Sequence, residues 1–329
     1  MRGRDMPLTD HAAGSDFALY AVLEDLKMGR YLGVKELLVE TGYDWPLRTF
    51  RTQVIALYAA YTRAIDNWCA DEPDDPDALM MWARVLTQRT FLLRSPANDP
   101  VVISAVDQAR RVCRAAIKAR PRCPVAWVCL LALAQFDADP RYQQIEEHWV
   151  PGADNQPEGP WPLFWAIRQR DPENREAVQR LLQYFYARKT GAHSVAQWVA
   201  MRAPECSILH MAPLYAYIED FRVQRARRQV SDFTYWTDPG VQRFVQRARD
   251  GWFAYLDADT STSPILSLDL NLLAWSCQRS GVGGARPVFE AIGRYVTVLP
   301  WQTLGSPEHW VDDFYAARGS AFKEQPVSY

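Results

Sequence analysis

The feature that most constrains this chain is a repeated pattern of two helix-length apolar segments separated by a short break that contains proline. Three such breaks contain Pro73, Pro121 and Pro204. Proline ends a helix because it has no backbone N–H and its ring clashes with the preceding turn. Helical hairpins made in this way stack, since a single hairpin cannot bury its apolar face alone. The pattern predicts an all-α fold built as a stack of helical hairpins.

The spacing of the breaks indicates a degenerate array. The interval from Pro121 to Pro204 is nearly twice the interval from Pro73 to Pro121. This ratio fits a hairpin unit of roughly 40 residues that occurs once in the first interval and twice in the second. The period is loose, so the sequence predicts an α-solenoid whose units have diverged.

The distribution of apolar periodicity, proline and glycine divides the chain into five expected segments. Residues 1–16 and 320–329 should be flexible ends, and residues 17–136 should form N-terminal helical hairpins. Residues 137–160 are rich in Pro, Gly and Asp and should form an exposed loop or hinge. Residues 161–319 should form C-terminal hairpins that continue the same superhelix.

One long helix is expected over residues 46–70, because a proline at its start suits the first turn. Its apolar residues recur every three or four positions and should face the core along one stripe: Leu57, Tyr58, Tyr61, Ile65 and Trp68. The acidic run over residues 71–77 should end this helix and cap the next one, because carboxylates complement a helix N-terminus.

Composition argues against several classes of protein. The chain has 329 residues and a formal net charge of −2, so its overall charge attracts it neither to nucleic acid nor to an anionic membrane. No apolar run approaches the ~20 residues of a membrane-spanning helix, and no signal-peptide core is present. We therefore expect a cytoplasmic protein. The six cysteines lack CxxC spacing and should be buried thiols, and we expect neither a metal nor a cofactor.

A set of short motifs carries a resemblance to known helical-repeat families. They occur in this order: Ile65-Asp66-Asn67-Trp68, Arg120-Pro121, Asp171-Pro172, Lys189-Thr190-Gly191-Ala192-His193-Ser194 and Arg202-Ala203-Pro204. The chain resembles tetratricopeptide-type repeats without their strict consensus. Over residues 17–225 it also resembles a bacterial family catalogued as a domain of unknown function, although a second glycine is missing after Ala192. This resemblance implies a repeat-like helical fold and no particular activity.

Catalytic motifs are absent from the sequence. It contains no Walker A, HExxH or G-x-S-x-G pattern, and the neighbouring Asp74 and Asp75 are best interpreted as helix caps. If the protein is an enzyme, four residues are candidate acid–base groups: His193, His210, Tyr215 and Glu219. The simpler interpretation makes Ser194 the N-cap of a helix beside His193, and makes His210 a core histidine.

Candidate binding residues come from the tryptophans and arginines. Three tryptophans flank the expected loop and are candidates for an exposed aromatic patch, with burial in the core as the alternative: Trp149, Trp161 and Trp165. Three arginines are candidates to hold carboxylates or carbonyl groups of a partner: Arg84, Arg89 and Arg168.

Together these observations favour a non-catalytic scaffold that holds a peptide or protein partner in a concave groove. The alternative is an enzyme or auxiliary tailoring protein that acts on a small molecule in an aromatic-lined helical cavity. A third hypothesis, a nucleic-acid-associated regulator, rests on the basic stretches 110–122 and 222–228. Solvated helix faces explain these two stretches more simply.

Overall fold

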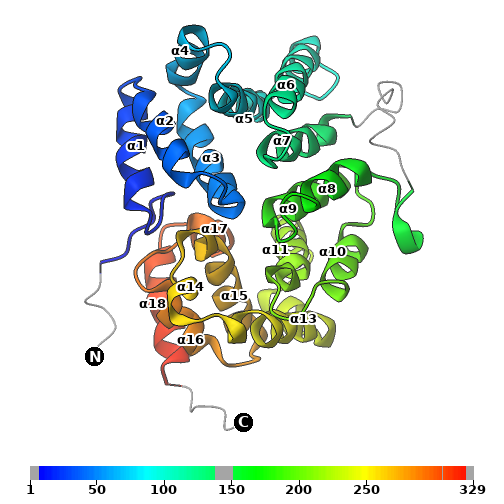
Figure 1. Ribbon diagram of the computed structural model, residues 1–329. Coiled ribbons are helices and arrows are strands. Elements are labelled where there is room, and N and C mark those ends of the chain that lie inside the picture. Colours follow the sequence, from blue (N-terminus) through cyan, green and yellow to red (C-terminus); the bar gives the residue numbers. More distant parts are fainter. Residues whose placement is uncertain (1–6, 138–150, 306, 324–329) are drawn as a thin grey trace. The chain divides into compact units, whose positions relative to one another are not determined.

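The computed structural model describes residues 7–137, 151–305 and 307–323, and its regular structure is helical (Figure 1). Within those ranges the β-type pairing is a single isolated parallel bridge, between Thr9 and Tyr295. The predicted all-α fold is therefore confirmed. The chain forms two compact units: an N-terminal unit, Asp16–Val195, and a C-terminal unit that combines Ala196–Tyr329 with Met1–Ser15.

The helices of the N-terminal unit pack mainly against their near neighbours in the sequence. Helix α3 contacts α1 and α5, α5 contacts α6 and α7, and α7 contacts α8 and α9. Pairing between near neighbours is what helical hairpins produce. The bounds are α1 (Phe17–Lys27), α2 (Leu32–Thr41), α3 (Trp45–Ala59), α4 (Ala64–Asp71), α5 (Pro76–Leu92), α6 (Pro100–Ala119), α7 (Val125–Leu133), η1 (Ala134–Phe136), η4 (Ala153–Asn155), α8 (Trp161–Arg168) and α9 (Arg175–Ala187).

Several helices begin with an aspartate cap followed by proline in the first turn. The side chains of Asp44, Asp75 and Asp99 each accept a hydrogen bond from a backbone N–H of the first turn. The N–H groups at a helix start have no partner within the helix, and proline has no N–H to satisfy there. The acidic run before α5 therefore acts as the cap that the sequence predicts.

The prediction of one long helix over residues 46–70 is wrong, because the helix is interrupted at residues 60–63, between α3 and α4. The expected stripe breaks with it: Trp68 is buried, whereas Tyr61 is 76% exposed. The carbonyls freed at the break are held by Arg89 of α5, whose Nε donates to the Ala60 carbonyl (3.2 Å) and whose Nη2 donates to the Thr62 carbonyl (2.7 Å). A tertiary contact thus satisfies the backbone groups that a continuous helix would pair internally.

The C-terminal unit is organised around α15 (Ser267–Ser280), which packs against α11, α12, α13, α16, α17 and α18. An aromatic cluster lies beside α15, in which the Trp301 ring meets Trp275, Phe289 and Phe314 at 5.0–5.9 Å between centroids. The other bounds are η5 (Ile208–Met211), α11 (Ala212–Ala226), α12 (Asp232–Trp236), α13 (Pro239–Gly251), η6 (Phe253–Tyr255), α14 (Ala258–Ser261), η7 (Pro264–Leu266), α16 (Ala285–Ile292), α17 (Val298–Leu304) and α18 (Trp310–Ala321).

The expected flexible start of the chain is partly built into the C-terminal unit. Thr9 donates its N–H to the Arg294 carbonyl (2.8 Å) and accepts from Val296 N–H (2.9 Å), and Ala13 is fully buried. Residues 1–6 and 324–329 lie outside the described residues, as do residues 138–150 of the expected loop. The division between the units falls within α10 (Ala192–Met201). Residues 161–195 therefore belong with the hairpins that precede them.

We expect Asp66→Asn to destabilise the folded chain at neutral pH by about 1 kcal/mol, a value discounted for the partial exposure of the pair. Asp66 accepts from Arg89 at 2.6 and 2.8 Å, and this hydrogen bonding is the main cause of its pKa lying below the ordinary value of 3.8. A carboxyl with a lowered folded-state pKa stabilises the fold above its unfolded pKa and loses that effect as the pH falls through the folded pKa.

The test is urea denaturation followed by tryptophan fluorescence at several pH values. The difference between parent and D66N should be constant at neutral pH and should narrow as the pH falls below 3.8, the ordinary value for this carboxyl. The exposed Asp74 provides the control, and D74N should match the parent throughout. A gap between D66N and the parent that persists unchanged in acid would contradict this account.

Candidate functional site

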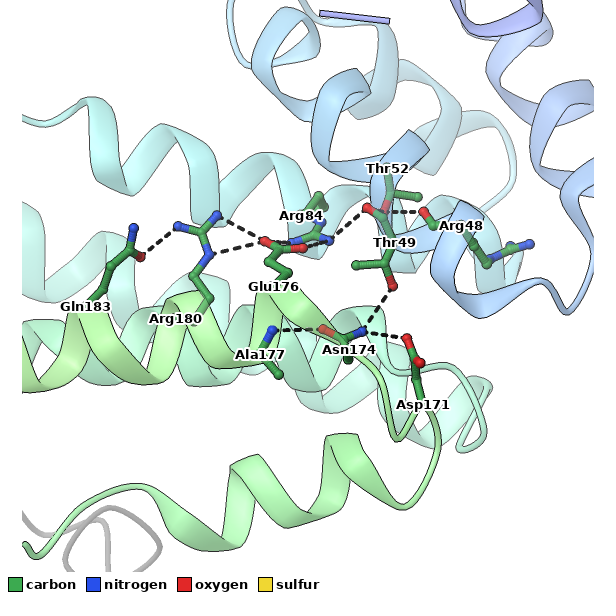
Figure 2. Close-up of polar contacts among 10 residues, drawn as sticks. All are labelled: Arg48, Thr49, Thr52, Arg84, Asp171, Asn174, Glu176, Ala177, Arg180 and Gln183. Carbon is green, nitrogen blue, oxygen red and sulfur yellow. Dashed lines mark hydrogen bonds and ion pairs between the residues drawn. The ribbon is translucent and has the colours of Figure 1, made fainter. Parts of the chain in front are cut away.

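The most extensive buried polar arrangement of the N-terminal unit is centred on an ion pair between α5 and α9 (Figure 2). Arg84 Nη1 and Nη2 donate to the two carboxylate oxygens of Glu176 at 2.8 and 2.7 Å. The bidentate geometry uses both outer nitrogens of the guanidinium, and both side chains are almost completely buried. The pair therefore fixes the distance and orientation of the two helices.

Further donors surround the Glu176 carboxylate and join α3 to the network. Arg180, one turn later on α9, donates from Nε and Nη2 to Glu176 Oε1 at 3.1 and 3.0 Å. Arg84 Nη2 also donates to the Thr49 carbonyl of α3 at 3.3 Å. Asn174, the N-cap of α9, bonds both Thr49 and Asp171 (Figure 2). Three helices are therefore connected around the Arg84–Glu176 pair, α3 through Arg84 and Asn174.

The electrostatics of Glu176 follow from this arrangement. Burial by itself would raise the pKa of the carboxyl, but the charges of Arg84 and Arg180 and their hydrogen bonds more than offset it, so the pKa lies below its usual value. Two guanidinium groups face one carboxylate, and Glu176 therefore stays ionised inside the unit.

A pair of buried thiols lies beside Arg84. Cys113 of α6 and Cys129 of α7 are both buried, and their thiols influence one another's pKa. Burial raises the pKa of Cys113 well above its usual value. Burial acts in the same direction on Cys129, but the Cys113 hydrogen bond and the Arg84 charge bring the pKa of Cys129 to about 7. Among the other cysteines, Cys206 is exposed, contrary to the expectation that all six thiols are buried.

Two of the arginines proposed from the sequence for partner binding are engaged inside the unit. Arg84 is 3% exposed and held by Glu176, and Arg89 is held by Asp66 and the carbonyls between α3 and α4. The sequence places Arg84 on the apolar side of α5, three or four residues from Met80, Met81 and Thr87, which are all buried. This placement on the apolar side of α5 is the sequence feature that indicates an acidic partner for Arg84 inside the unit.

The two described tryptophan candidates, Trp161 and Trp165, both lie on helix α8 but differ in exposure. Trp161 is 2% exposed and packs between Phe164 and Phe185 while its Nε1 donates to the Pro157 carbonyl (2.9 Å). Trp165, one turn later, is 40% exposed. Core burial is thus the outcome for Trp161, and Trp149 lies outside the described residues.

Arg168 lies one turn after Trp165 on the same side of α8. Its guanidinium is half-buried over the Phe164 ring, 5.9 Å from the centroid. No carboxylate of the described chain lies within ion-pair distance of it. Burial lowers the pKa of Arg168 below its usual value, and the nearby Glu173 opposes that shift only in part. Arg168 is therefore a partly desolvated cation that has no ion-pair partner among the described residues.

Three of the four candidate acid–base residues, His210, Tyr215 and Glu219, have different partners. His210 Nδ1 accepts from Arg247 Nε at 3.2 Å, and its ring lies against Gly251. Tyr215 donates to the buried Asp269 of α15. Glu219 is paired with Arg222 at 2.6 Å on the exposed side of α11.

His193 belongs to the N-terminal unit, whereas the other three candidates belong to the C-terminal unit. It is half-buried in the first turn of α10, which begins at Ala192. The Ser194 hydroxyl donates to the Gly191 carbonyl (2.9 Å). The predicted Ser194 cap is therefore wrong, because the helix starts two residues earlier.

Two general properties complete the description. Within residues 7–137, 151–305 and 307–323, no group of three or more His, Cys, Asp or Glu side chains is arranged to hold a metal ion. None of the described helices combines the length and the apolar character needed to cross a bilayer.

Comparisons with protein-family models, with curated proteins and with solved structures found no match to this chain.

We expect Glu176→Gln to destabilise the chain by about 3–5 kcal/mol, because it leaves the buried charge of Arg84 without its counter-charge. The double variant Arg84→Met with Glu176→Leu should recover most of this loss, since a buried ion pair can be replaced by packed apolar side chains. The measurement is urea denaturation, with hydrogen exchange of α5 and α9 peptides to follow this unit separately.

The matched control is the exposed pair of Glu219 and Arg222, for which Glu219→Gln should change the free energy of unfolding by less than about 1 kcal/mol. Similar losses in the free energy of unfolding for E176Q and E219Q would show that burial does not increase the contribution of the Arg84–Glu176 pair to stability.

Proposed function

We propose that this protein is a helical scaffold that binds a peptide or protein partner, and that α8 contributes to the contact surface. The observation that carries the proposal is the pair formed by Trp165 and Arg168, an exposed indole and a partly desolvated guanidinium one helical turn apart. Trp and Arg are the residue types most enriched among the energetic centres of protein interfaces.

The chemistry of the pair explains why a partner would be stabilised there. The exposed indole of Trp165 offers a large apolar area with few rotatable bonds to immobilise. Arg168 has lost part of its hydration to Phe164 without gaining a carboxylate. A carboxylate or carbonyl of a partner would supply the missing hydrogen bonds and would compensate that desolvation.

The tetratricopeptide-like stacking of the hairpins forms part of this proposal. It is supported by the neighbour-to-neighbour packing of α3, α5, α7 and α9 and by the Asp–Pro starts of several helices. Stacked helical pairs create extended surfaces on which partner segments are held. Arg84 and Arg89 would then have a structural role. Arg84 joins α5 to α9, and Arg89 joins α5 to the segment between α3 and α4.

We expect Trp165→Ala combined with Arg168→Ala to remove partner binding with little loss of stability. Truncating such a pair typically weakens an interface by about 2 kcal/mol or more per residue. The measurement is affinity capture from native lysate with the tagged full chain, quantified by mass spectrometry, followed by titration of the captured protein.

Tyr61→Ala is the matched control, because Tyr61 is a more exposed aromatic residue of the same unit. The proposal requires a stoichiometric protein that the parent and Y61A retain and that the double variant loses. Equal capture by all three proteins would remove α8 from the binding surface. Co-elution of a small molecule without a protein would favour the enzyme alternative.

A further inference from the structure

The second half of α6 and its exit carry a concentrated positive charge. From Ala109 to Arg122 the sequence contains six Arg or Lys residues and no Asp or Glu: Arg110, Arg111, Arg114, Lys118, Arg120 and Arg122. The whole chain has a net charge of −2, so this concentration is local. It cannot be explained by a generally basic composition.

The structure divides the five of these cations that precede Pro121 into two sets, and Arg122 is exposed after the end of α6. Arg110 is buried and bonds both carboxylate oxygens of Asp137 at 2.7 and 2.8 Å, and Arg120 is paired with Asp77. Arg111, Arg114 and Lys118 are exposed and follow one another at intervals of three and four residues, which places them along one face of the helix. We call these three side chains the α6 cationic row.

The cationic row has no acidic partner among the residues that the structure describes. Within the described parts of the chain, no carboxylate lies within ion-pair distance of Arg111, Arg114 or Lys118. Asp107, one turn before Arg111, is also exposed and forms no ion pair with the row. Some other surface cations of this protein are paired within their own helix, as Lys27 is with Glu24 and Arg286 is with Glu290.

Leaving the row unpaired has an energetic cost. Like charges three or four residues apart on a helix repel one another and destabilise it, and only Lys118 gains from the helix dipole in the last turn. An opposing row of carboxylates would remove that repulsion. The row extends about 10 Å along the axis at 1.5 Å per residue, a length that matches acidic side chains spaced three or four residues apart on a second helix.

The surroundings of the row favour a polypeptide over a nucleic acid. Helix α6 contains no aromatic residue, so it offers no ring on which an unpaired base can stack. Two of the neighbouring exposed positions, Ser104 and Ala115, carry small uncharged side chains. They leave room for a second backbone to approach closely.

We propose that the α6 cationic row docks an acidic segment of a partner protein. This interaction surface goes beyond the proposed contact on α8 and does not depend on it. Carboxylates of the partner pair with Arg111, Arg114 and Lys118, and complementary charge increases the association rate and fixes the orientation of the segment.

The test is fluorescence anisotropy of a labelled oligoglutamate peptide titrated with the full chain at low ionic strength. The variant R111Q/R114Q/K118Q should have a dissociation constant about 10-fold higher than that of the parent. The expected change is moderate because each exposed ion pair contributes modestly. Glutamine retains the length and helix propensity of these side chains, and circular dichroism checks that the variant folds. A glutamine peptide of the same length should not bind.

The matched control is R227Q/R228Q/R243Q, which removes the same charge from exposed arginines of the C-terminal unit and should leave binding within about 2-fold of the parent. Equal weakening by both triple variants, or no binding by the parent at low salt, would overturn the proposal. Tighter binding of an oligothymidylate than of oligoglutamate would overturn it in favour of a nucleic acid.

The α8 double variant separates this inference from the proposed function. W165A/R168A should bind oligoglutamate as the parent does, even if it no longer captures a partner from lysate. Loss of oligoglutamate binding in W165A/R168A with retention in the α6 variant would assign the anion to α8 and overturn the α6 assignment.

Discussion

The buried ion pair between Arg84 and Glu176 is the interaction on which the rest of the N-terminal unit depends. It joins α5 to α9 across 92 positions of sequence and reaches the backbone of α3 through the Thr49 carbonyl. A charge removed from water is tolerated only when it is paired and hydrogen-bonded. Each helix must therefore hold its register for the pair to form, and a shift of one helix would leave a buried charge uncompensated.

Other arginines of this unit have a related structural part at helix ends. Arg48 Nη1 donates to the carbonyls of Leu38, in the last turn of α2, and of Gly42, its C-cap, at 2.9 Å each, and Arg89 holds the carbonyls between α3 and α4. The last carbonyls of a helix have no partner within it. Because a guanidinium carries several donors in a fixed fork, it can satisfy these carbonyls and a carboxylate at once. Arginine thereby satisfies carbonyls both at the end of α2, where Gly42 is the C-cap, and at the break between α3 and α4, which contains no glycine.

Local chemistry made the class of fold and many helix starts predictable. Asp75 and Asp99, each directly before a proline, mark helix starts from sequence alone. The break between α3 and α4 was missed, because residues 60–63 contain neither glycine nor proline and the carbonyls there are held by Arg89, which is distant in sequence.

The candidate site was predictable only in part, again because interacting residues are distant in the sequence. Arg84 was singled out, but its partner Glu176 lies far away in the sequence, and local patterns do not report such pairings. For Trp161 and Trp165, the sequence spacing alone does not tell which ring faces the core. The structure separates them, since packing against Phe185 and a bond to the Pro157 carbonyl bury Trp161.

The bridge between Thr9 and Tyr295 has a consequence for the order of folding. The N-terminal unit is continuous in sequence, so all of its parts have left the ribosome when Val195 emerges. The C-terminal unit needs residues 7–15, which are made before the N-terminal unit, and a partner near residue 295, which is made after it. During synthesis the N-terminal unit can fold before Thr9 has its partners. Thr9 pairs only when residues 294–296, which follow α16, have been made. The topology therefore delays completion of the C-terminal unit until residues 294–296 have been made.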